Sequence, residues 1–139
     1  MIVHIEVFGA DDGAMSATIE AAILRTAAAL GPGLREMAYA TFLAGDLAAH
    51  HHRIEREHIA PIVAGGRQCS FMRFDLVVDH SIVIEVKAKR GLAPEDRLQI
   101  QAYLRHAPAL SFGVLVNFAQ IGDTTPAKAW TLESNNKKE

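Results

Sequence analysis

The sequence has one cysteine, no long apolar run and no excess of positive charge, and each of these absences excludes a class of protein. A single cysteine, Cys69, cannot form a disulfide within the chain, which favours a reducing compartment, here the cytoplasm. No apolar run is long enough to cross a bilayer, and the first residues lack the basic start and apolar stretch of a signal peptide. We therefore expect a cytoplasmic protein without a membrane partner.

The charge balance also restricts the partners. The chain has 14 Lys and Arg residues against 16 Asp and Glu residues, so the formal net charge is −2. Binding to nucleic acid through bulk positive charge is excluded, and any such contact must depend on a local patch. With 139 residues, half of them hydrophobic, the chain is predicted to form a single domain over residues 1–139. Its core is expected at about residues 14–133, with a polar tail at 134–139.

Apolar periodicity and Gly/Pro breakers predict the secondary structure. The expected elements are helices at about 14–30 and 34–49, strands at 53–63, 67–78 and 82–88, a helix at 94–106, a strand at 111–118 and a last strand at 128–132. The first nine residues alternate weakly and leave two alternatives, a short edge strand or a partly ordered leader. This order predicts an α/β fold with a mixed sheet, in which a helix connects two parallel strands.

Core positions follow from the same patterns. One face of the strand at 67–78 should be buried together with one face of the strand at 82–88, and the helix at 34–49 should bury its apolar stripe. The predicted core residues are Phe74, Leu76 and Val78, then Ile82, Ile84, Val86 and Ala88, and in the helix Leu34, Met37, Ala38, Phe42 and Leu47. Pro61 indicates that the strand at 53–63 lies at an edge of the sheet.

The opposite face of the hairpin carries Asp75 on one strand and Glu85 on the next. If Val78 pairs with Ile82, Asp75 falls directly opposite Glu85, with Cβ atoms roughly 4.5–5.5 Å apart, where like charges repel. A hard divalent cation held by oxygen ligands would explain two facing carboxylates. A solvated polar face with an ion pair to Lys87 explains them equally well, so both alternatives stay open at this point.

Basic and histidine-rich stretches are the remaining candidates for contacts. Arg53 and Arg56, and separately Lys89 and Arg90, are the local basic residues that could contact nucleic acid. The triplet at 50–52 consists of three consecutive histidines, whose side chains cannot converge on one ion from a single helix face or strand. A solvated helix end is the favoured interpretation of that triplet.

Three short motifs resemble a known family. Gly33-Leu34-Arg35-Glu36-Met37-Ala38-Tyr39 fits the Gly-x-x-Glu-x-x-Tyr signature of the GxxExxY proteins, which belong to the PD-(D/E)XK nuclease superfamily. Asp75 followed by Glu85-Val86-Lys87 is similar to the Asp…Glu-x-Lys core of that superfamily. Gln99-Ile100-Gln101-Ala102-Tyr103 is similar to the Gln-x-x-x-Tyr motif of its RecB-like branch. The resemblance covers roughly residues 14–118.

This resemblance implies a restriction-endonuclease-like core: a mixed central sheet, made of a three-strand antiparallel meander plus a parallel strand, flanked by helices. It also implies a Mg²⁺ or Mn²⁺ ion held by Asp75, Glu85 and the carbonyl of Val86, with Glu36 binding the ion directly or through a water. Catalytic roles are implied for six residues: Glu36, Asp75, Glu85, Lys87, Gln99 and Tyr103. Packing and capping remain alternative roles for the last two.

The function implied by the resemblance is metal-dependent hydrolysis of phosphodiester bonds, with DNA favoured over RNA as the substrate. The alternative is a nuclease-fold domain with weak or no catalysis that binds nucleic acid or protein. An ordinary α/β domain with a solvated charged face is the third interpretation. A homodimer is compatible with a small nuclease, because one active site could cut both strands only as part of a pair or in two visits.

Overall fold

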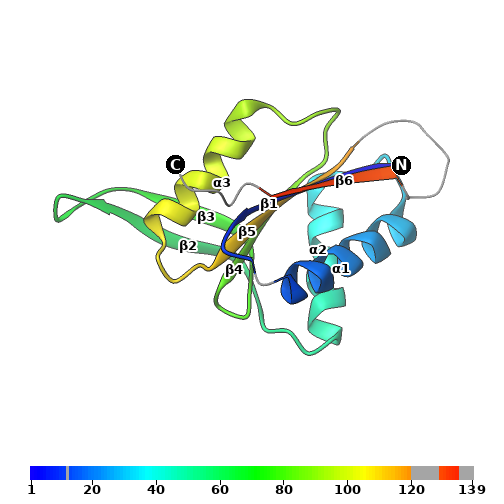
Figure 1. The fold of residues 1–139 in the computed structure, drawn as a ribbon, viewed down its shortest axis with the longest axis horizontal. Helices are drawn as coiled ribbons and strands as arrows, with labels where there is room; N and C mark the ends of the chain where they lie inside the picture. Colours follow the sequence, from blue (N-terminus) through cyan, green and yellow to red (C-terminus); the bar gives the residue numbers. More distant parts are fainter. Residues whose placement is uncertain (12, 120–128, 135–139) are drawn as a thin grey trace.

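The central sheet has six strands in the order β2-β3-β4-β5-β1-β6, as seen in the computed structural model (Figure 1). The structure describes residues 1–11, 13–119 and 129–134. The strands are β1 (Ile2–Gly9), β2 (Ile54–Ala64), β3 (Arg67–Val78), β4 (Ile82–Lys87), β5 (Phe112–Phe118) and β6 (Ala129–Ser134). Strands β2, β3 and β4 form an antiparallel meander, and β4 pairs in parallel with β5. The expected mixed sheet is confirmed.

Helices cover both faces of the sheet. Helices α1 (Ala14–Leu30) and α2 (Glu36–Ala49) lie on one face, and α3 (Pro94–His106) lies on the other (Figure 1). Two buried apolar clusters correspond to these layers. The larger cluster joins α1 and α2 to the sheet, and the smaller one joins Ile100 and Tyr103 of α3 to the opposite face. No helix in the described ranges is long and apolar enough to span a membrane.

The first nine residues do form a strand, as one of the two alternatives predicted, but β1 is an interior strand, so its predicted edge position is wrong, as is the partly ordered leader. It pairs antiparallel with β5 and parallel with β6. Its apolar side chains are buried on both faces: Val3, Ile5 and Val7 belong to the cluster with α1 and α2, whereas Phe8 belongs to the cluster with α3. Burial on both faces explains why the alternation is weak, since polar positions are scarce in a strand without a solvated face.

Several predicted boundaries agree with the structure. Strand β3 and helix α3 have the predicted bounds, and Pro94 occupies the first turn of its helix as expected. Strand β2, which contains Pro61, is the edge strand predicted from that proline. The last described strand continues to Ser134, beyond the predicted end at 132 and into the predicted tail. The remaining tail, 135–139, and the predicted strand start at 128 lie outside the described residues.

The buried face of α2 differs from the predicted one. Leu34 and Met37 are exposed, with 40% and 64% of their surface accessible, whereas Tyr39 and Leu43 are fully buried. The reason is that the helix begins at Glu36, after an extended Arg35, so Leu34 lies outside the helix. Its buried residues are Tyr39, Ala40, Leu43, Ala44 and Leu47. Only Leu47 was predicted correctly, while Ala38 and Phe42 are intermediate in exposure.

The face of β3 that points to the larger cluster changes at Asp75. Leu76 and Val78 pack with α1 and α2, as predicted, but Phe74 packs with Met72 under α3. The prediction that Phe74 shares a face with Leu76 is therefore wrong. The alternation of buried side chains along β3 is therefore interrupted at Asp75, which is the predicted metal ligand.

Candidate active site

Asp75 and Glu85 meet where β3 separates from β4. The two strands pair from Val78↔Ile82 to Leu76↔Ile84, which confirms the predicted register. One residue further, side chains replace the backbone pairing. The N–H of Asp75 donates to Oε2 of Glu85 at 3.1 Å, and the N–H of Val86 donates to Oδ2 of Asp75 at 2.8 Å. Each carboxylate thus contacts the main chain of the opposite strand, and the two acidic groups are neighbours.

Burial makes this pair electrostatically unfavourable. Glu85 is only 2% exposed. Burial, and then the charge of the neighbouring Asp75 carboxylate, raise the pKa of Glu85 from 4.5 to about 8. The backbone N–H of Asp75 and the ammonium of Lys87 act in the opposite direction and only partly compensate. The pair therefore favours any added positive charge, whether it arrives as a proton or as a cation.

Lys87 lies beside the pair and is held by helix α3. Its Nζ donates to Oε1 of Gln99 at 3.2 Å and lies 3.8 Å from Oδ1 of Asp96. Asp96 also binds Nζ of Lys89 at 2.6 Å and accepts a hydrogen bond from the N–H of Ala93 at the start of the helix. Gln99 thus contacts Lys87, the predicted catalytic lysine. Asp96 was not predicted, because no motif marks it.

Tyr103, four residues after Gln99 on α3, contacts the neighbouring strand instead of the carboxylates. Its hydroxyl donates to the carbonyl oxygen of Arg73 at 3.0 Å, and its ring packs edge-on against Phe74. Burial, followed by the charges of Glu85 and Asp75, raises the pKa of Tyr103 to about 12. The phenol therefore stays neutral and ties α3 to β3 two residues from Asp75. These contacts agree with the alternative role of Tyr103, which is packing.

Glu36, the first residue of α2, lines a hollow together with Asp75 and Val86. This open hollow of about 140 Å³ lies between α2 and the strands β2 to β4, and Arg56 and Arg73 border it. Desolvation raises the pKa of Glu36; the positive charge of nearby Lys87 lowers it, and the charge of Asp75 raises it further. Helix α2 thus brings the third predicted acidic residue to the side of the hollow that Asp75 occupies.

The predicted basic residues lie in different places. Arg56 borders the hollow and donates through Nη1 to the hydroxyl of Thr41 at 3.0 Å. Arg53 lies at the β3–β4 turn, where its N–H binds Asp79, so the structure does not bring it to the carboxylates. Lys89 is paired with Asp96, as described above. Arg90 lines a separate hollow next to Arg97.

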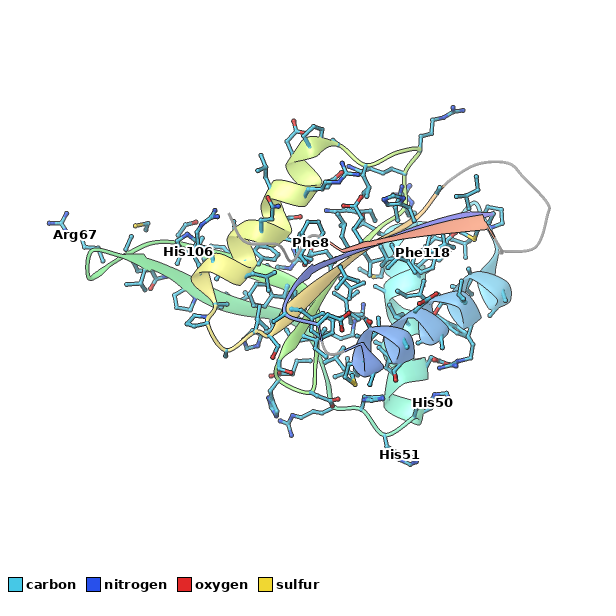
Figure 2. The ribbon with its side chains drawn as sticks, in the orientation of Figure 1. Phe8, His50, His51, Arg67, His106 and Phe118 are labelled. Atoms are coloured by element: carbon cyan, nitrogen blue, oxygen red, sulfur yellow. The ribbon has the colours of Figure 1, made fainter. Side chains whose placement is uncertain are left out.

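The histidine triplet lies at the end of α2, as the solvated-end interpretation predicts. His50 binds the backbone oxygen of Asp46 in the last turn, and His52 binds the carboxylate of Asp79. Figure 2 shows His50 and His51 on the periphery of the molecule.

A second buried carboxylate, Glu6 on β1, was missed by sequence reasoning. It is fully buried and bound by Arg97 of α3, with Nε to Oε1 at 2.7 Å, and by His4. Burial alone would raise the pKa of Glu6, but the hydrogen bonds from Arg97 and His4 outweigh it and hold the pKa below the ordinary value. Glu6 and Arg97 are 91 positions apart in the chain, so no local pattern indicates the pair.

The chemistry of the Asp75–Glu85 pair suits a hard divalent cation. Magnesium is commonly bound by one or two carboxylates, completed by waters and substrate phosphates. Here the buried carboxylate of Glu85 and the partly buried carboxylate of Asp75 repel one another, and each binds one backbone N–H through one of its oxygens. Within the described residues, no three His, Cys, Asp or Glu side chains are grouped closely enough to bind an ion by themselves. The residues therefore fit an ion that takes part of its coordination from water or substrate.

A central meander, a parallel fourth strand and a carboxylate pair at the point where the meander opens define an α/β protein with a restriction-endonuclease-like core. The family model described as the PD-(D/E)XK nuclease superfamily matches residues 13–128, most of the chain. The chain belongs to the PD-(D/E)XK nuclease superfamily, which confirms the resemblance at that level and supports a nuclease-like function. No curated protein and no solved structure gives a match.

Proposed function

We propose that this protein is a Mg²⁺- or Mn²⁺-dependent nuclease that hydrolyses phosphodiester bonds, with DNA as the favoured substrate. The observation that carries the proposal is the contact between the buried Glu85 carboxylate and the partly buried Asp75 carboxylate, next to an ammonium group held by Gln99. Superfamily membership agrees with this chemistry. The narrower assignment, to the GxxExxY proteins of the RecB-like branch, is part of the proposal.

The proposed roles follow from these positions. Asp75, Glu85 and the carbonyl of Val86 would hold the ion, and Glu36 would reach it directly or through a water. When bound, the ion neutralises phosphate charge and makes a water more acidic. Lys87 orients the attacking water or stabilises the negative charge that develops on the phosphate. Gln99 positions Lys87 by accepting its hydrogen bond.

Cleavage assays test the proposal. Labelled single-stranded and duplex DNA, and labelled RNA, are incubated with the wild type, Asp75→Ala and Lys87→Ala in Mg²⁺ or Mn²⁺. Asp11→Ala serves as a control for the loss of a carboxylate that is not part of the proposed site. The Asp11 side chain binds the N–H of Gly13 at the start of α1. We expect the wild type and the control to cleave, and both site variants to lose about 10³-fold or more, which corresponds to several kcal/mol. A wild type that cleaves no substrate would refute the proposal.

Two observations favour the second candidate, a nuclease-fold domain with weak or no catalysis that binds nucleic acid or protein. Both carboxylates already accept backbone hydrogen bonds, and no group of three potential ligands is preformed in the described part of the chain. If the wild type binds nucleic acid while wild type and variants are equally inert on every substrate, the binding module is correct. Sedimentation of the same samples tests the homodimer, which stays a prediction.

A further inference from the structure

The hairpin formed by β2 and β3 extends away from the body of the protein (Figure 1). Figure 2 shows Arg67 at its tip. One face of this hairpin packs on the cluster under α3, through Ala60, Ile62, Met72 and Phe74. Helices α1 and α2 lie on the other side of the sheet and leave the opposite face of the hairpin uncovered.

Apolar side chains are concentrated on the uncovered face. The register pairs Ile59 with Arg73 and Pro61 with Phe71, which places all four on the side opposite Met72. Ile59 and Phe71 are 59% and 58% exposed. Val63 is 54% exposed. We call the surface formed by Ile59, Pro61, Val63, Phe71 and Arg73 the hairpin face. It holds three of the six large exposed hydrophobic residues in the described part of the chain.

The distal part of the hairpin differs in charge from the whole chain, although β2 and β3 together contain as many acidic as basic side chains, three of each. Residues 58–74 contain no Asp or Glu and include two arginines, Arg67 and Arg73, although acidic residues outnumber basic ones overall. At the base of the hairpin, Nη2 of Arg73 lies 3.4 Å from Glu57, with both side chains about half exposed. A phosphate group can compete for an ion pair that water already reaches. An aromatic ring among apolar groups, bordered by arginine, suits a nucleic-acid strand with accessible bases.

A second copy of this chain is disfavoured as an added strand at the β2 edge, which borders the hairpin face. Extending the sheet through the β2 edge would require a row of available backbone N–H and C=O groups. Pro61 has no N–H, and Glu57 has a left-handed φ of 52°, so the edge is interrupted at two positions. Both features disfavour pairing with another strand.

The hairpin face leads directly to the proposed active site. Arg73 is two residues from Asp75 on β3, and both line the hollow that also contains Glu36. At a rise of about 3.3 Å per residue, Phe71 lies about 13 Å along the strand from Asp75, a span of a few nucleotides. We propose that the hairpin face binds single-stranded nucleic acid, with a base stacked on Phe71 and a phosphate on Arg73. That the bound nucleic acid continues from the hairpin face toward Asp75 rests on the nuclease function proposed above.

Binding measurements on variants of Phe71 test this surface. Fluorescence anisotropy in EDTA, where cleavage is absent, is used with labelled 20-residue oligo-dT, 20-residue oligo-rU and a 20-base-pair DNA duplex. We expect Phe71→Ala to weaken single-strand binding roughly tenfold, the effect of losing one stacked base, and to change duplex binding less than twofold. Phe71→Trp should bind like the wild type, and Phe71→Leu should be as weak as Phe71→Ala. The relative affinity for the two single strands shows which of these two probes the face prefers.

The matched control is Leu98→Ala on α3, since Leu98 is 62% exposed. It should bind like the wild type. Equal single-strand affinity for the wild type and Phe71→Ala would overturn the proposal, as would full affinity of Phe71→Leu. A wild-type dimer that Phe71→Ala converts to monomer in sedimentation would also overturn it. Cleavage in Mg²⁺ separates the two proposals: a wild type that cleaves without dependence on Phe71 refutes only the hairpin face, whereas Phe71-dependent binding without cleavage refutes only the nuclease.

Discussion

Two buried glutamates in this protein have opposite electrostatic surroundings. Glu6 and Glu85 are both at most 2% exposed, and both lie in interior strands of the same sheet. Glu6 faces the guanidinium of Arg97, and its pKa is lowered, whereas Glu85 faces the carboxylate of Asp75, and its pKa is raised to about 8. The difference arises from the partner, since burial acts in the same direction on both.

This comparison separates a structural carboxylate from a site. Glu6 has its counter-charge in the protein and connects β1 to α3. Glu85 lacks an adequate counter-charge, because Lys87 donates to Gln99 and the nearest acidic neighbour adds repulsion. A protein tolerates such an arrangement when another charge completes it, and a buried carboxyl group with a strongly raised pKa is typical of functional sites.

The largest expected effect comes from breaking the ion pair between Glu6 and Arg97. Arg97→Ala leaves the buried Glu6 carboxylate without its guanidinium, so we expect the free energy of unfolding to fall by about 3 kcal/mol at pH 7. Urea unfolding measures this loss, and Arg97→Lys should recover part of it. A loss below about 1 kcal/mol would contradict the role assigned to the pair.

The pH dependence of the same variant has a defined sign. The folded pKa of Glu6 is lowered, so its stabilising contribution is present above the ordinary pKa near 4.5 and is lost as the pH falls through the folded value. The difference between wild type and Arg97→Ala should therefore shrink in acid. A difference that stays constant across this range would indicate that packing, and not charge, accounts for the loss.

Removing the repulsion between Asp75 and Glu85 should have the opposite effect on stability. Glu85→Gln removes one of two facing carboxylates and keeps an oxygen that can accept from the N–H of Asp75. In EDTA at pH 7.5 we expect the free energy of unfolding to rise by at least about 1 kcal/mol. Asp75→Asn should act in the same direction.

In Mg²⁺ or Mn²⁺ the wild type should instead be more stable than Glu85→Gln, because ion binding to the folded state stabilises the wild type and not the variant. Thermal unfolding with and without the ion measures both effects. A lower melting temperature for Glu85→Gln and for Asp75→Asn in EDTA would contradict the proposed repulsion.

A smaller effect is expected from the support of Lys87. Gln99→Ala removes the acceptor that holds Nζ of Lys87 at 3.2 Å, so kcat should fall about tenfold with little change in KM. Gln101, exposed on the same helix, provides the matched control Gln101→Ala. Equal cleavage rates for the two variants would show that Gln99 has no positioning role.

The smallest effect concerns two arginines that the sequence alone did not distinguish. Arg56 borders the hollow, whereas Arg53 lies at the β3–β4 turn next to Asp79. We expect Arg56→Ala to weaken DNA binding several-fold and to reduce its salt dependence by about one phosphate contact, with Arg53→Ala unchanged. A titration at several salt concentrations tests this, and equal weakening by both variants would contradict the placement.

Much of the fold near the site could be predicted because its signals are local. Gly and Pro breakers bound α3, and the turn at 79–81 sets the register that brings Asp75 to Glu85. These features depend on residues within a few positions of one another. The Asp…Glu-x-Lys spacing could be recognised for the same reason.

The remaining features depend on contacts between distant parts of the chain. The place of β1 in the sheet is set by pairing with β5, more than 100 residues later, and no pattern within 2–9 specifies it. The Glu6–Arg97 pair was missed for the same reason. The buried face of α2 was mispredicted because apolar side chains at its start, such as Met37, border the hollow instead of entering the core.

The central claim is that the Asp75–Glu85 pair binds a divalent cation. The most direct measurement is an anomalous difference map from crystals soaked in Mn²⁺, with crystals of Glu85→Gln treated identically. We predict a peak in direct contact with one carboxylate oxygen of Asp75 and one of Glu85, and no peak in the variant. A soaked wild-type crystal with no density between these two side chains would contradict the account.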